Sequence, residues 1–370
     1  MSEHPWMTPG DTIKAKLAER GWTQTDLARV LGRSASTVNE LIKGKQVISG
    51  EIAVVLSAAM GEPPEFWLGL EVTRQIAAAE CDATEVRRRA RLFSMAPIKD
   101  LEKRGWIEPT ETMDALESEL KSFFDAESLE AEPHIGACAK KTARGSRLSV
   151  AQRAWAFRAR QMAKAIPVKP YHASAFPSLV KKLQRLVAWP EHARKVPEVL
   201  ANFGIRFVVI EPLPQTRIDG VAFWLADDAP VIAMSMRFDR VDNFWHVLGH
   251  ELSHIANEDY PVVDSDLEGE GPSESETGDE IENRANRESS EMWISTAELG
   301  SFISRVGPLY SRDKINQFAN RMQVHPGIIV GQLQHRREVP YRAFRDTLVA
   351  VRKIVTDETL TDGWGHETGL

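Results

Sequence analysis

Cysteine is nearly absent from this chain, since only Cys81 and Cys138 occur in 370 residues. Two thiols cannot form a disulfide framework or a cysteine-rich zinc site. No apolar run approaches the roughly 20 residues that a membrane helix needs. The stretch from Met1 to Trp6 also lacks the basic and apolar regions of a signal peptide. We therefore expect a soluble, cytoplasmic protein that does not interact with membranes.

The chain also lacks an excess of positive charge. It has 46 Lys and Arg against 53 Asp and Glu, and the formal net charge is -7. This balance argues against a protein that coats nucleic acid over its whole surface, but it allows a local basic reading surface. With 42% hydrophobic residues in 370, the chain is long enough for two or three domains, each with its own core.

The stretch from His250 to His254 carries the clearest chemical pattern, HExxH. In a helix, His250 and His254 lie one turn apart on the same face, so both imidazoles can bind one metal ion, with Glu251 beside them as a base toward water. The competing interpretation is a chance match. A buried helix is favoured by apolar residues that recur at helical intervals on another face, namely Phe244, Leu248, Leu252 and Ile255.

A hydrolytic zinc site needs a third protein ligand and one open position. The best candidate is Glu282, slightly ahead of its rival Glu280, and both belong to an expected second helix after the loop that follows His254. His246 is a further candidate because it also lies four residues from His250. Its alternative role is that of a helix residue near the pocket.

The segment Glu282-Asn-Arg-Ala-Asn-Arg resembles the ExxAN segment that follows HExxH in the ImmA/IrrE-type metallopeptidases. The resemblance implies that Glu282 is the third zinc ligand. It further implies a zincin-like domain in which Glu251 transfers protons during peptide cleavage.

Residues 12–70 show a pattern of short helices. A break at Gly21 is followed by Thr23, a good N-cap, and a turn at residues 32–34 precedes a helix expected over residues 35–43. Two short helices around a glycine-containing turn are typical of a helix-turn-helix. An ordinary helical hairpin with solvated faces is the alternative.

The second of these helices presents small polar and basic residues suited to base edges and phosphates. Together with Gln24, the candidate DNA-binding residues are Ser34, Ser36, Thr37, Asn39, Lys43 and Lys45.

Several short motifs in residues 7–80 resemble the Cro-like DNA-binding domain of the HigA antitoxins. This resemblance implies an XRE-type regulator that binds a palindromic operator as a homodimer, beside a HigB-like toxin. The motifs include Arg20-Gly21-Trp22-Thr23-Gln24, Ser36-Thr37-Val38-Asn39-Glu40-Leu41-Ile42-Lys43-Gly44-Lys45 and Pro64-Glu65-Phe66-Trp67-Leu68.

Residues 81–200 are expected to form a mostly helical middle region without a catalytic motif. Within it, residues 140–169 contain nine Lys and Arg and no Asp or Glu. The pattern fits a solvated helix face, or a surface that contacts phosphates or docks an acidic loop.

From residue 201 the pattern changes to short β-rich runs that lead into the HExxH helix. A small sheet beside a metal helix can hold an extended peptide by strand addition. Residues 258–280 are acidic and lack Lys and Arg. This composition predicts a mobile surface insertion, a lid over the metal, or an acidic mimic that occupies a basic surface when DNA is absent. Residues 357–370 are expected to be a flexible tail.

Five short runs resemble long HigA-like proteins that carry an ImmA/IrrE-type domain, namely residues 218–220, 223–225, 230–233, 238–245 and 325–335. We therefore expect a mainly α fold with a small β-sheet (α+β). The expected domains are a helix-turn-helix at 1–80, a helical region at 81–200 and a zincin-like domain at 201–356.

The expected function is transcriptional regulation with a Zn²⁺ peptidase-like domain, its metal on His250, His254 and Glu282. One alternative is a stress-responsive zinc endopeptidase that cleaves a repressor or itself. Another is a DNA-binding regulator whose metal site is a catalytically silent sensor.

Overall fold

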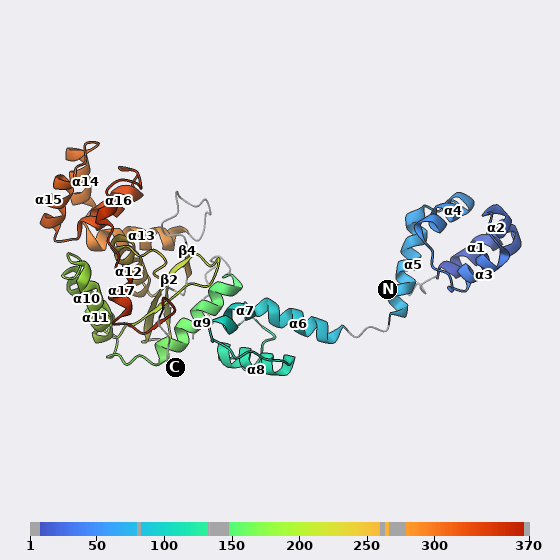
Figure 1. Cartoon of the computed structure of the whole chain (residues 1–370), viewed down its shortest axis with the longest axis horizontal. Coiled ribbons are helices and arrows are strands. Elements are labelled where there is room, and N and C mark those ends of the chain that lie inside the picture. The colour runs from blue at the N-terminus through green and yellow to red at the C-terminus, as the bar shows by residue number, and fades with distance from the viewer. Residues whose placement is uncertain are drawn as a thin grey trace. The chain divides into compact units, whose positions relative to one another are not determined.

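The computed structural model describes residues 8–79, 83–131, 133, 148–259, 263–265 and 279–365. The chain divides into two compact units, residues 1–87 and residues 88–370 (Figure 1). The division falls inside helix α6 (Thr84–Met95), a little beyond the expected boundary at residue 80. None of the helices in the described ranges is both long and apolar enough to cross a membrane.

Within residues 8–79, the first unit is built from α1 (Pro9–Arg20), α2 (Gln24–Val30), α3 (Ala35–Ile42), α4 (Gly50–Met60) and α5 (Pro64–Ala78). Their inward faces share one apolar core that includes Ile13, Leu27, Val38, Leu56 and Trp67. This arrangement confirms the expected set of short helices around a closed core.

Local sequence explains how the helices of the first unit begin and end. Gly21 ends α1 with a φ of 67°, a conformation that glycine adopts at little cost. Thr23 begins α2 with a capping box that it shares with Asp26. The predicted helix over residues 35–43 is one residue too long, because Lys43 is the C-cap of α3 and not part of it.

The second unit contains helices before, around and after one sheet. Its helices are α7 (Ile98–Lys103), α8 (Met113–Phe124), α9 (Val150–Lys164), α10 (Phe176–Gln184), α11 (Val196–Asn202), α12 (Val241–Ala256), α13 (Asp279–Trp293), α14 (Thr296–Val306), α15 (Arg312–Met322), α16 (Pro326–His335) and α17 (Arg352–Thr356). Short 3-10 helices lie at Ala173–Ala175, Pro190–Lys195 and Arg345–Thr347.

The sheet has five strands in the order β4-β2-β3-β1-β5. The strands are β1 (Arg206–Ile210), β2 (Ile218–Trp224), β3 (Pro230–Met234), β4 (Val263–Ser265) and β5 (Thr361–Asp362). β1 pairs in parallel with β3 and β5, whereas β2 pairs antiparallel with β3 and β4. The small sheet expected before the HExxH helix is therefore present, and it is mixed.

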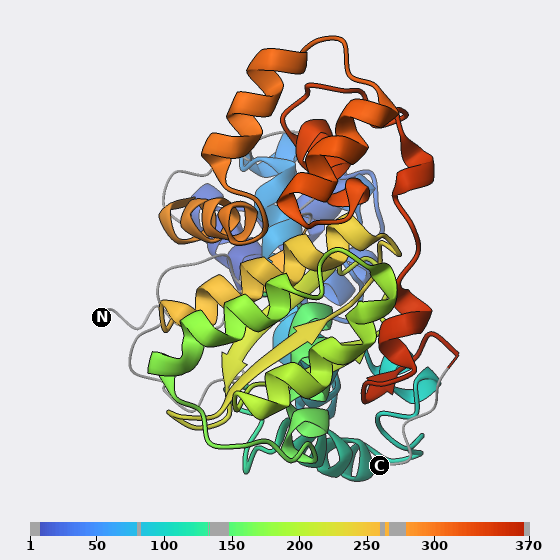
Figure 2. The ribbon, with the colours of Figure 1, turned by 90° about the vertical axis from the view of Figure 1, so that its left-hand side faces the viewer.

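Both faces of the sheet are covered by helices. Phe207 and Val209 of β1 join one apolar cluster with α10, α11 and α12, which lie in front of the strands in Figure 2. Val208 and Ile210 of the same strand join the other cluster, with α9 and the helices that precede it. Because successive residues of a strand point to opposite faces, one strand contributes to both cores.

The expected middle region is part of the second unit from residue 88 onward. Its α9 covers one face of the sheet, with Trp155 and Phe157 fully buried. Apolar side chains of α9 pack against the strands in one continuous core. The expected boundary at residue 200 therefore does not separate two cores.

The prediction of a flexible tail is wrong for residues 357–365. Thr361 and Asp362 form β5 against β1, and Trp364 donates a hydrogen bond from Nε1 to the Ser235 carbonyl at 3.0 Å. Asp362 is buried and accepts hydrogen bonds from Trp106 Nε1 at 2.9 Å and Arg158 Nε at 2.7 Å. Residues 366–370 lie outside the described part of the chain.

The basic run over residues 140–169 is not the uniform surface that its composition suggested. Arg153 is buried, and Arg158 is paired with Asp362. Lys164 is paired with Asp125 at 2.7 Å. Residues 140–147 lie outside the described residues, as do residues 260–262 and 266–278 of the acidic insertion.

Candidate metal centre and nucleic-acid interface

Helix α12 holds the two histidines in fixed directions. Leu248 and Leu252 are fully buried in the core that α12 shares with the sheet. His250 and His254 are 0% and 2% exposed. At Gly249, an added Cβ would lie 2.7 Å from both Ser289 Oγ and Trp293 Nε1. The absence of a side chain at this position lets α13 approach α12 closely.

This close approach brings Glu282 of α13 to the two histidines. The Nε2 atoms of His250 and His254 are 3.0 Å apart. Glu282 lies 3.1 Å from His250 through Oε2 and 3.7 Å from His254 through Oε1. One ligand atom from each residue lies within 4.8 Å of the others. Glu280, the rival candidate, is exposed and does not belong to this group.

The donor set fits a zinc ion. In a tetrahedral site with ligand distances of about 2.1 Å, neighbouring ligand atoms lie about 3.4 Å apart. The two Nε2 atoms lie 3.0 Å apart, and the distances from His250 to Glu282 Oε2 and from His254 to Glu282 Oε1, 3.1 and 3.7 Å, lie on either side of that value. Two imidazoles and one carboxylate are also the ligand set of many catalytic zinc sites. The three side chains are therefore close enough to one another for a single ion to contact all of them.

The outer nitrogen of each histidine has an oxygen partner. His250 Nδ1 lies 3.0 Å from Asn286 Oδ1, and His254 Nδ1 lies 3.0 Å from Asp259 Oδ2. Asn286 Oδ1 and Asp259 Oδ2 can each accept a hydrogen bond from an Nδ1–H, and the tautomer with its proton on Nδ1 directs the Nε2 lone pair to the shared centre. The two tautomers therefore suit metal binding.

Asp259 is itself held in place by Arg284 of α13. The hydrogen bond from Arg284 to Asp259 is the first cause that raises the pKa of the guanidinium above its ordinary value. Sequence reasoning assigned Asp259 to the acidic insertion and gave Asn286 no separate role. Asn286 is the asparagine of the ExxAN segment, so the motif could have pointed to it. Asp259 lies among other acidic residues, and no sequence pattern distinguishes it from them.

Glu251 is fully buried on the side of α12 that faces the sheet. A Cβ added at Gly220 of β2 would lie 2.2 Å from Glu251 Oε1 and 3.0 Å from Val247 Cγ1. The backbone of β2 therefore passes directly against the Glu251 carboxylate and limits its movement. Glu251 directly follows His250 in the helix, and it is not a member of the metal-ligand group.

His246 lies outside the metal-ligand group but close to it. Its ring centre is 6.4 Å from that of His250 and 6.4 Å from that of His335 in α16. Its Nδ1 lies 3.4 Å from Ser289 Oγ. The structure thus places His246 at the border between the metal centre and a neighbouring pocket, and His335 is a pocket residue that sequence reasoning did not single out.

In the first unit, the structure places the candidate DNA-binding residues on α3 and around it. Ser34 is the N-cap of α3, and its side chain accepts a hydrogen bond from the Thr37 amide at 3.1 Å. Ser36 is exposed, and Asn39 is half-buried on the same helix. Ser34 therefore has a structural role in beginning the helix, while Ser36 and Asn39 remain accessible.

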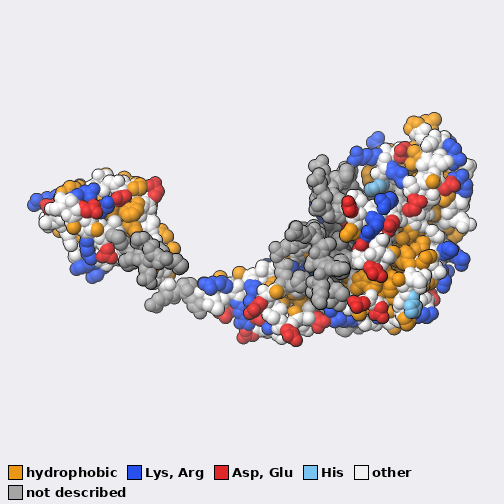
Figure 3. Space-filling view, turned by 180° about the vertical axis from the view of Figure 1, so that it is seen from behind, with side chains coloured by type: hydrophobic (Ala, Val, Ile, Leu, Met, Phe, Trp, Pro, Cys, Tyr) orange, Lys and Arg blue, Asp and Glu red, His pale blue; other side chains and the backbone are white. Residues whose placement is uncertain are grey.

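The remaining candidates lie at the edges of the two-helix motif. Lys43 is the C-cap of α3, Lys45 follows it, and both side chains are exposed. Gln24 is the first residue of α2 and is exposed. On the faces that Figure 3 shows, basic and acidic side chains are interspersed over both units. This mixture is consistent with a local contact surface instead of a broad basic one.

Comparison with known proteins supports the helix-turn-helix. The sequence profile of the family described as "Helix-turn-helix" matches residues 13–67. That range begins in α1 and ends in α5, so it includes the α2–α3 motif and its core. The first unit is thus a helix-turn-helix DNA-binding domain.

Three relatives share sequence with this chain over 63 to 90 residues. The uncharacterized HTH-type transcriptional regulator YddM of Escherichia coli is 34% identical over 90 residues, which are 24% of this chain and 94% of that protein. Antitoxin HigA-1 of Vibrio cholerae is 38% identical over 63 residues, 17% of this chain and 59% of the antitoxin. Virulence-associated protein A' of Dichelobacter nodosus is 39% identical over 64 residues, 17% of this chain and 56% of that protein. The chain belongs to the helix-turn-helix family of transcriptional regulators.

Proposed function

We propose that this regulator carries a zinc metallopeptidase domain in its second unit. The observation that carries the proposal is the convergence of His250 Nε2, His254 Nε2 and the Glu282 carboxylate on one point. Glu251 lies next to this point in sequence and is buried against β2. Two histidines, one carboxylate ligand and one further buried carboxylate are the residues that zinc-dependent peptide hydrolysis requires.

Each residue has a separate task in this chemistry. When bound, zinc supplies a Lewis acid that polarises a carbonyl and acidifies water. The Glu251 carboxylate accepts a proton from the attacking water and returns it to the nitrogen of the leaving amine. Asn286 and Asp259 keep the His250 and His254 rings oriented, through the contacts at 3.0 Å.

We further propose that the first unit binds a palindromic operator as a homodimer. A two-fold dimer presents its two recognition helices one helical turn apart, so the half-sites should be about 10 base pairs apart or a multiple of that. The similarity to Antitoxin HigA-1 suggests autorepression and a HigB-like toxin as partner. The peptide substrate in this proposal is a repressor or the chain itself.

Two experiments test the two halves of this proposal. The zinc-loaded full chain should cleave members of a quenched fluorescent peptide library, and Glu251→Gln should abolish cleavage while zinc remains bound. Footprinting at the protein's own promoter should show a palindromic protected site. Cleavage by Glu251→Gln would contradict the assignment of Glu251 as the base. Absence of protection at that promoter would contradict the autorepressor role.

A further inference from the structure

Strand β4 covers the outer edge of the sheet beside β2 (Figure 1). It pairs antiparallel with β2, and the register joins Val263 to Val221 and Asp264 to Gly220. The opposite edge of β2 pairs with β3. In the described part of the sheet, β4 is therefore the strand that occupies the outer backbone groups of β2. Without β4, that edge could pair with an extended peptide.

The edge that β4 covers runs beside the proposed base. A Cβ added at Gly220 would lie 2.2 Å from Glu251 Oε1, so β2 passes against this carboxylate at the residue that pairs with Asp264. Because adjacent strands lie about 4.8 Å apart, the β4 backbone is one strand spacing from the residue that touches Glu251. A peptide paired with β2 in place of β4 would take the same position relative to the base.

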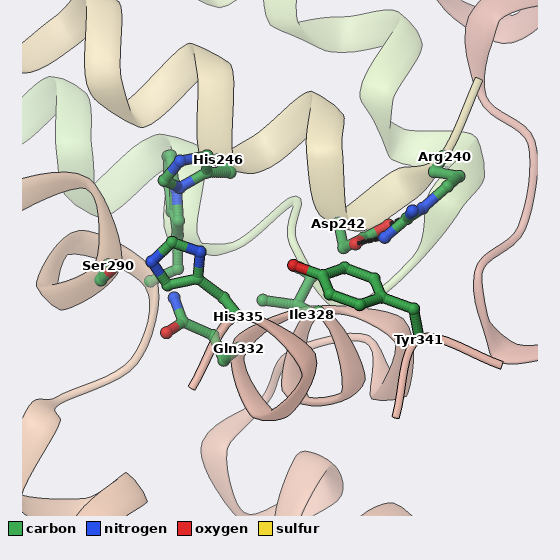
Figure 4. Close-up of a pocket in the computed structure, with 10 residues that line it drawn as sticks. Arg240, Asp242, His246, Ser290, Ile328, Gln332, His335 and Tyr341 are labelled. Carbon is green, nitrogen blue, oxygen red and sulfur yellow. Dashed lines mark hydrogen bonds and ion pairs between the residues drawn. The ribbon is translucent and has the colours of Figure 1, made fainter. Parts of the chain in front are cut away.

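A different face of α12 borders the pocket beside α16. Figure 4 shows His246 of α12 directed toward His335 of α16, and the two ring centres are 6.4 Å apart. Glu251 follows His246 by five residues, which correspond to about 140° around a helix. Glu251 does not line this pocket. For a peptide that approaches the base, the edge of β2 is therefore the relevant surface.

The chain connects β4 closely to the metal centre. Asp259 Oδ2 lies 3.0 Å from His254 Nδ1, and Arg284 pairs with the same carboxylate. Val263 follows Asp259 by four residues, which span at most about 14 Å. This short tether holds β4 near β2 at a high effective concentration, so that β4 competes strongly with a free peptide.

The pairing between β4 and β2 is nevertheless short and irregular. β4 has three residues, and the register shifts between Ile218 and Gly220. At this irregularity, the carbonyl oxygen of Asp219 accepts a hydrogen bond from the amide of Ser235, directly after β3, at 2.9 Å. A three-residue edge strand with such a shift is held by few hydrogen bonds and can open locally.

We propose that β4 is a built-in competitor that occupies the place of the peptide substrate on β2. The substrate binds in an extended conformation, antiparallel to β2, after β4 has left that edge. While β4 is paired, the peptidase site is autoinhibited. This inference rests on the proposed zinc peptidase function, to which it adds a mode of substrate binding and its regulation.

A labelled peptide with the sequence of residues 260–268 tests whether β4 can be exchanged, and this test requires neither zinc nor catalysis. The variant Val263→Pro/Asp264→Pro weakens the pairing of β4, because proline lacks an N–H group and adjacent N–H groups of a strand point to opposite sides. If β4 covers the edge in about nine of ten molecules, the variant should bind the peptide roughly tenfold more tightly than the wild type. Fluorescence anisotropy measures both dissociation constants.

Cleavage kinetics test whether β4 and the substrate share this edge. For a library peptide that the zinc-loaded wild type cleaves, KM should fall roughly tenfold in the proline variant, with kcat unchanged. The matched control Val263→Thr/Asp264→Asn keeps both N–H groups, so it should retain the wild-type KM and peptide affinity. Circular dichroism and zinc content verify that each variant is folded and loaded.

A cross-link between β4 and β2 should have the opposite effect. Val221 and Val263 are register partners. The Cα atoms of antiparallel partners lie about 4.5 to 5.5 Å apart, within the range that a disulfide spans. In a chain with Cys81→Ser and Cys138→Ser, the pair Val221→Cys and Val263→Cys should lose cleavage on oxidation and regain it on reduction with a phosphine.

The outcomes separate the role of β4 from that of the metal centre. Equal peptide affinities of the wild type and the proline variant, an unchanged KM, or full cleavage by the oxidised chain would overturn the inference and leave the peptidase function intact. Absence of cleavage in every zinc-loaded chain, the reduced one included, would overturn the proposed function, and the inference with it.

Discussion

The two candidate functional regions hold their side chains in opposite ways. On α3, Ser36 and Lys43 are exposed and ready for contact with a ligand that approaches from outside. At the candidate metal centre, His250 and His254 are buried, and each ring has an oxygen partner at Nδ1. Substitutions on α3 should therefore change binding alone, whereas those near the metal should change geometry and chemistry together.

The largest effect is expected at Gly220, where a strand of the sheet touches the proposed base. In Gly220→Ala the new Cβ would lie 2.2 Å from Glu251 Oε1, so the carboxylate must move. A displacement of about 1 Å at a catalytic group can reduce the rate roughly 100-fold. We expect peptide cleavage to fall by that factor while zinc stays bound, as measured by peptide hydrolysis and metal analysis.

Gly300→Ala is the matched control for this substitution. Gly300 lies in α14, and a Cβ there meets nothing within 4 Å. This variant should cleave at the wild-type rate. Wild-type cleavage by Gly220→Ala would show that β2 does not fix the position of the Glu251 carboxylate. It would then weaken the contrast between the buried metal centre and the exposed surface of α3.

The next effect concerns the groups that orient the histidines. Asp259→Asn and Asn286→Leu should each reduce zinc affinity about 10- to 100-fold, because loss of such partners leaves a ligand less basic and less well oriented. Competition with a zinc-binding dye measures the affinity. Asn283→Leu, at an exposed position of the same helix α13, should leave it unchanged. Wild-type affinity in Asp259→Asn would contradict the role of the His254 contact.

The smallest effects are expected on the DNA-binding surface. Lys43→Ala and Lys45→Ala should each weaken binding to every sequence and reduce the slope of log affinity against log salt by about 0.9 per lost phosphate contact. Asn39→Ala and Thr37→Val should instead alter the preferred sequence. Fluorescence anisotropy over a salt series measures both properties.

Lys14→Ala supplies a control for the DNA measurements, since Lys14 is an exposed lysine of α1 that contacts Asp11 at 3.3 Å. It should leave the salt slope unchanged. A slope reduced equally by Lys14→Ala, or identical sequence preferences in the Thr37 and Asn39 variants, would contradict the assignment of α3 as the reading helix.

Local patterns were sufficient to predict much of the first unit. Gly21 and Thr23 act at the ends of helices through contacts within a few residues, so their roles can be read from the sequence. Likewise, the four-residue spacing of His250 and His254 predicted one shared face. The sequence could only rank Glu282 above Glu280, because the choice depends on how α13 packs against α12 at Gly249.

Long-range contacts account for what could not be predicted. The partnership of Asp362 with Trp106 and Arg158 joins residues more than 200 positions apart, so a C-terminal segment with few apolar residues resembled a tail. In the same way, Arg158 belonged to a run whose composition suggested a solvated face. Composition cannot show that a charged side chain has a buried partner elsewhere in the fold.

Zinc content of the full chain tests the central claim most directly. After zinc loading and dialysis, mass spectrometry of the metal should give one zinc per chain for the wild type, Glu251→Gln and Glu280→Gln. His250→Ala and His254→Ala should retain none, and Glu282→Gln should retain less than the wild type. A wild-type chain without zinc, or a His250→Ala chain that keeps it, would contradict the metal centre. Loss of zinc in Glu280→Gln but not in Glu282→Gln would identify the other carboxylate as the ligand.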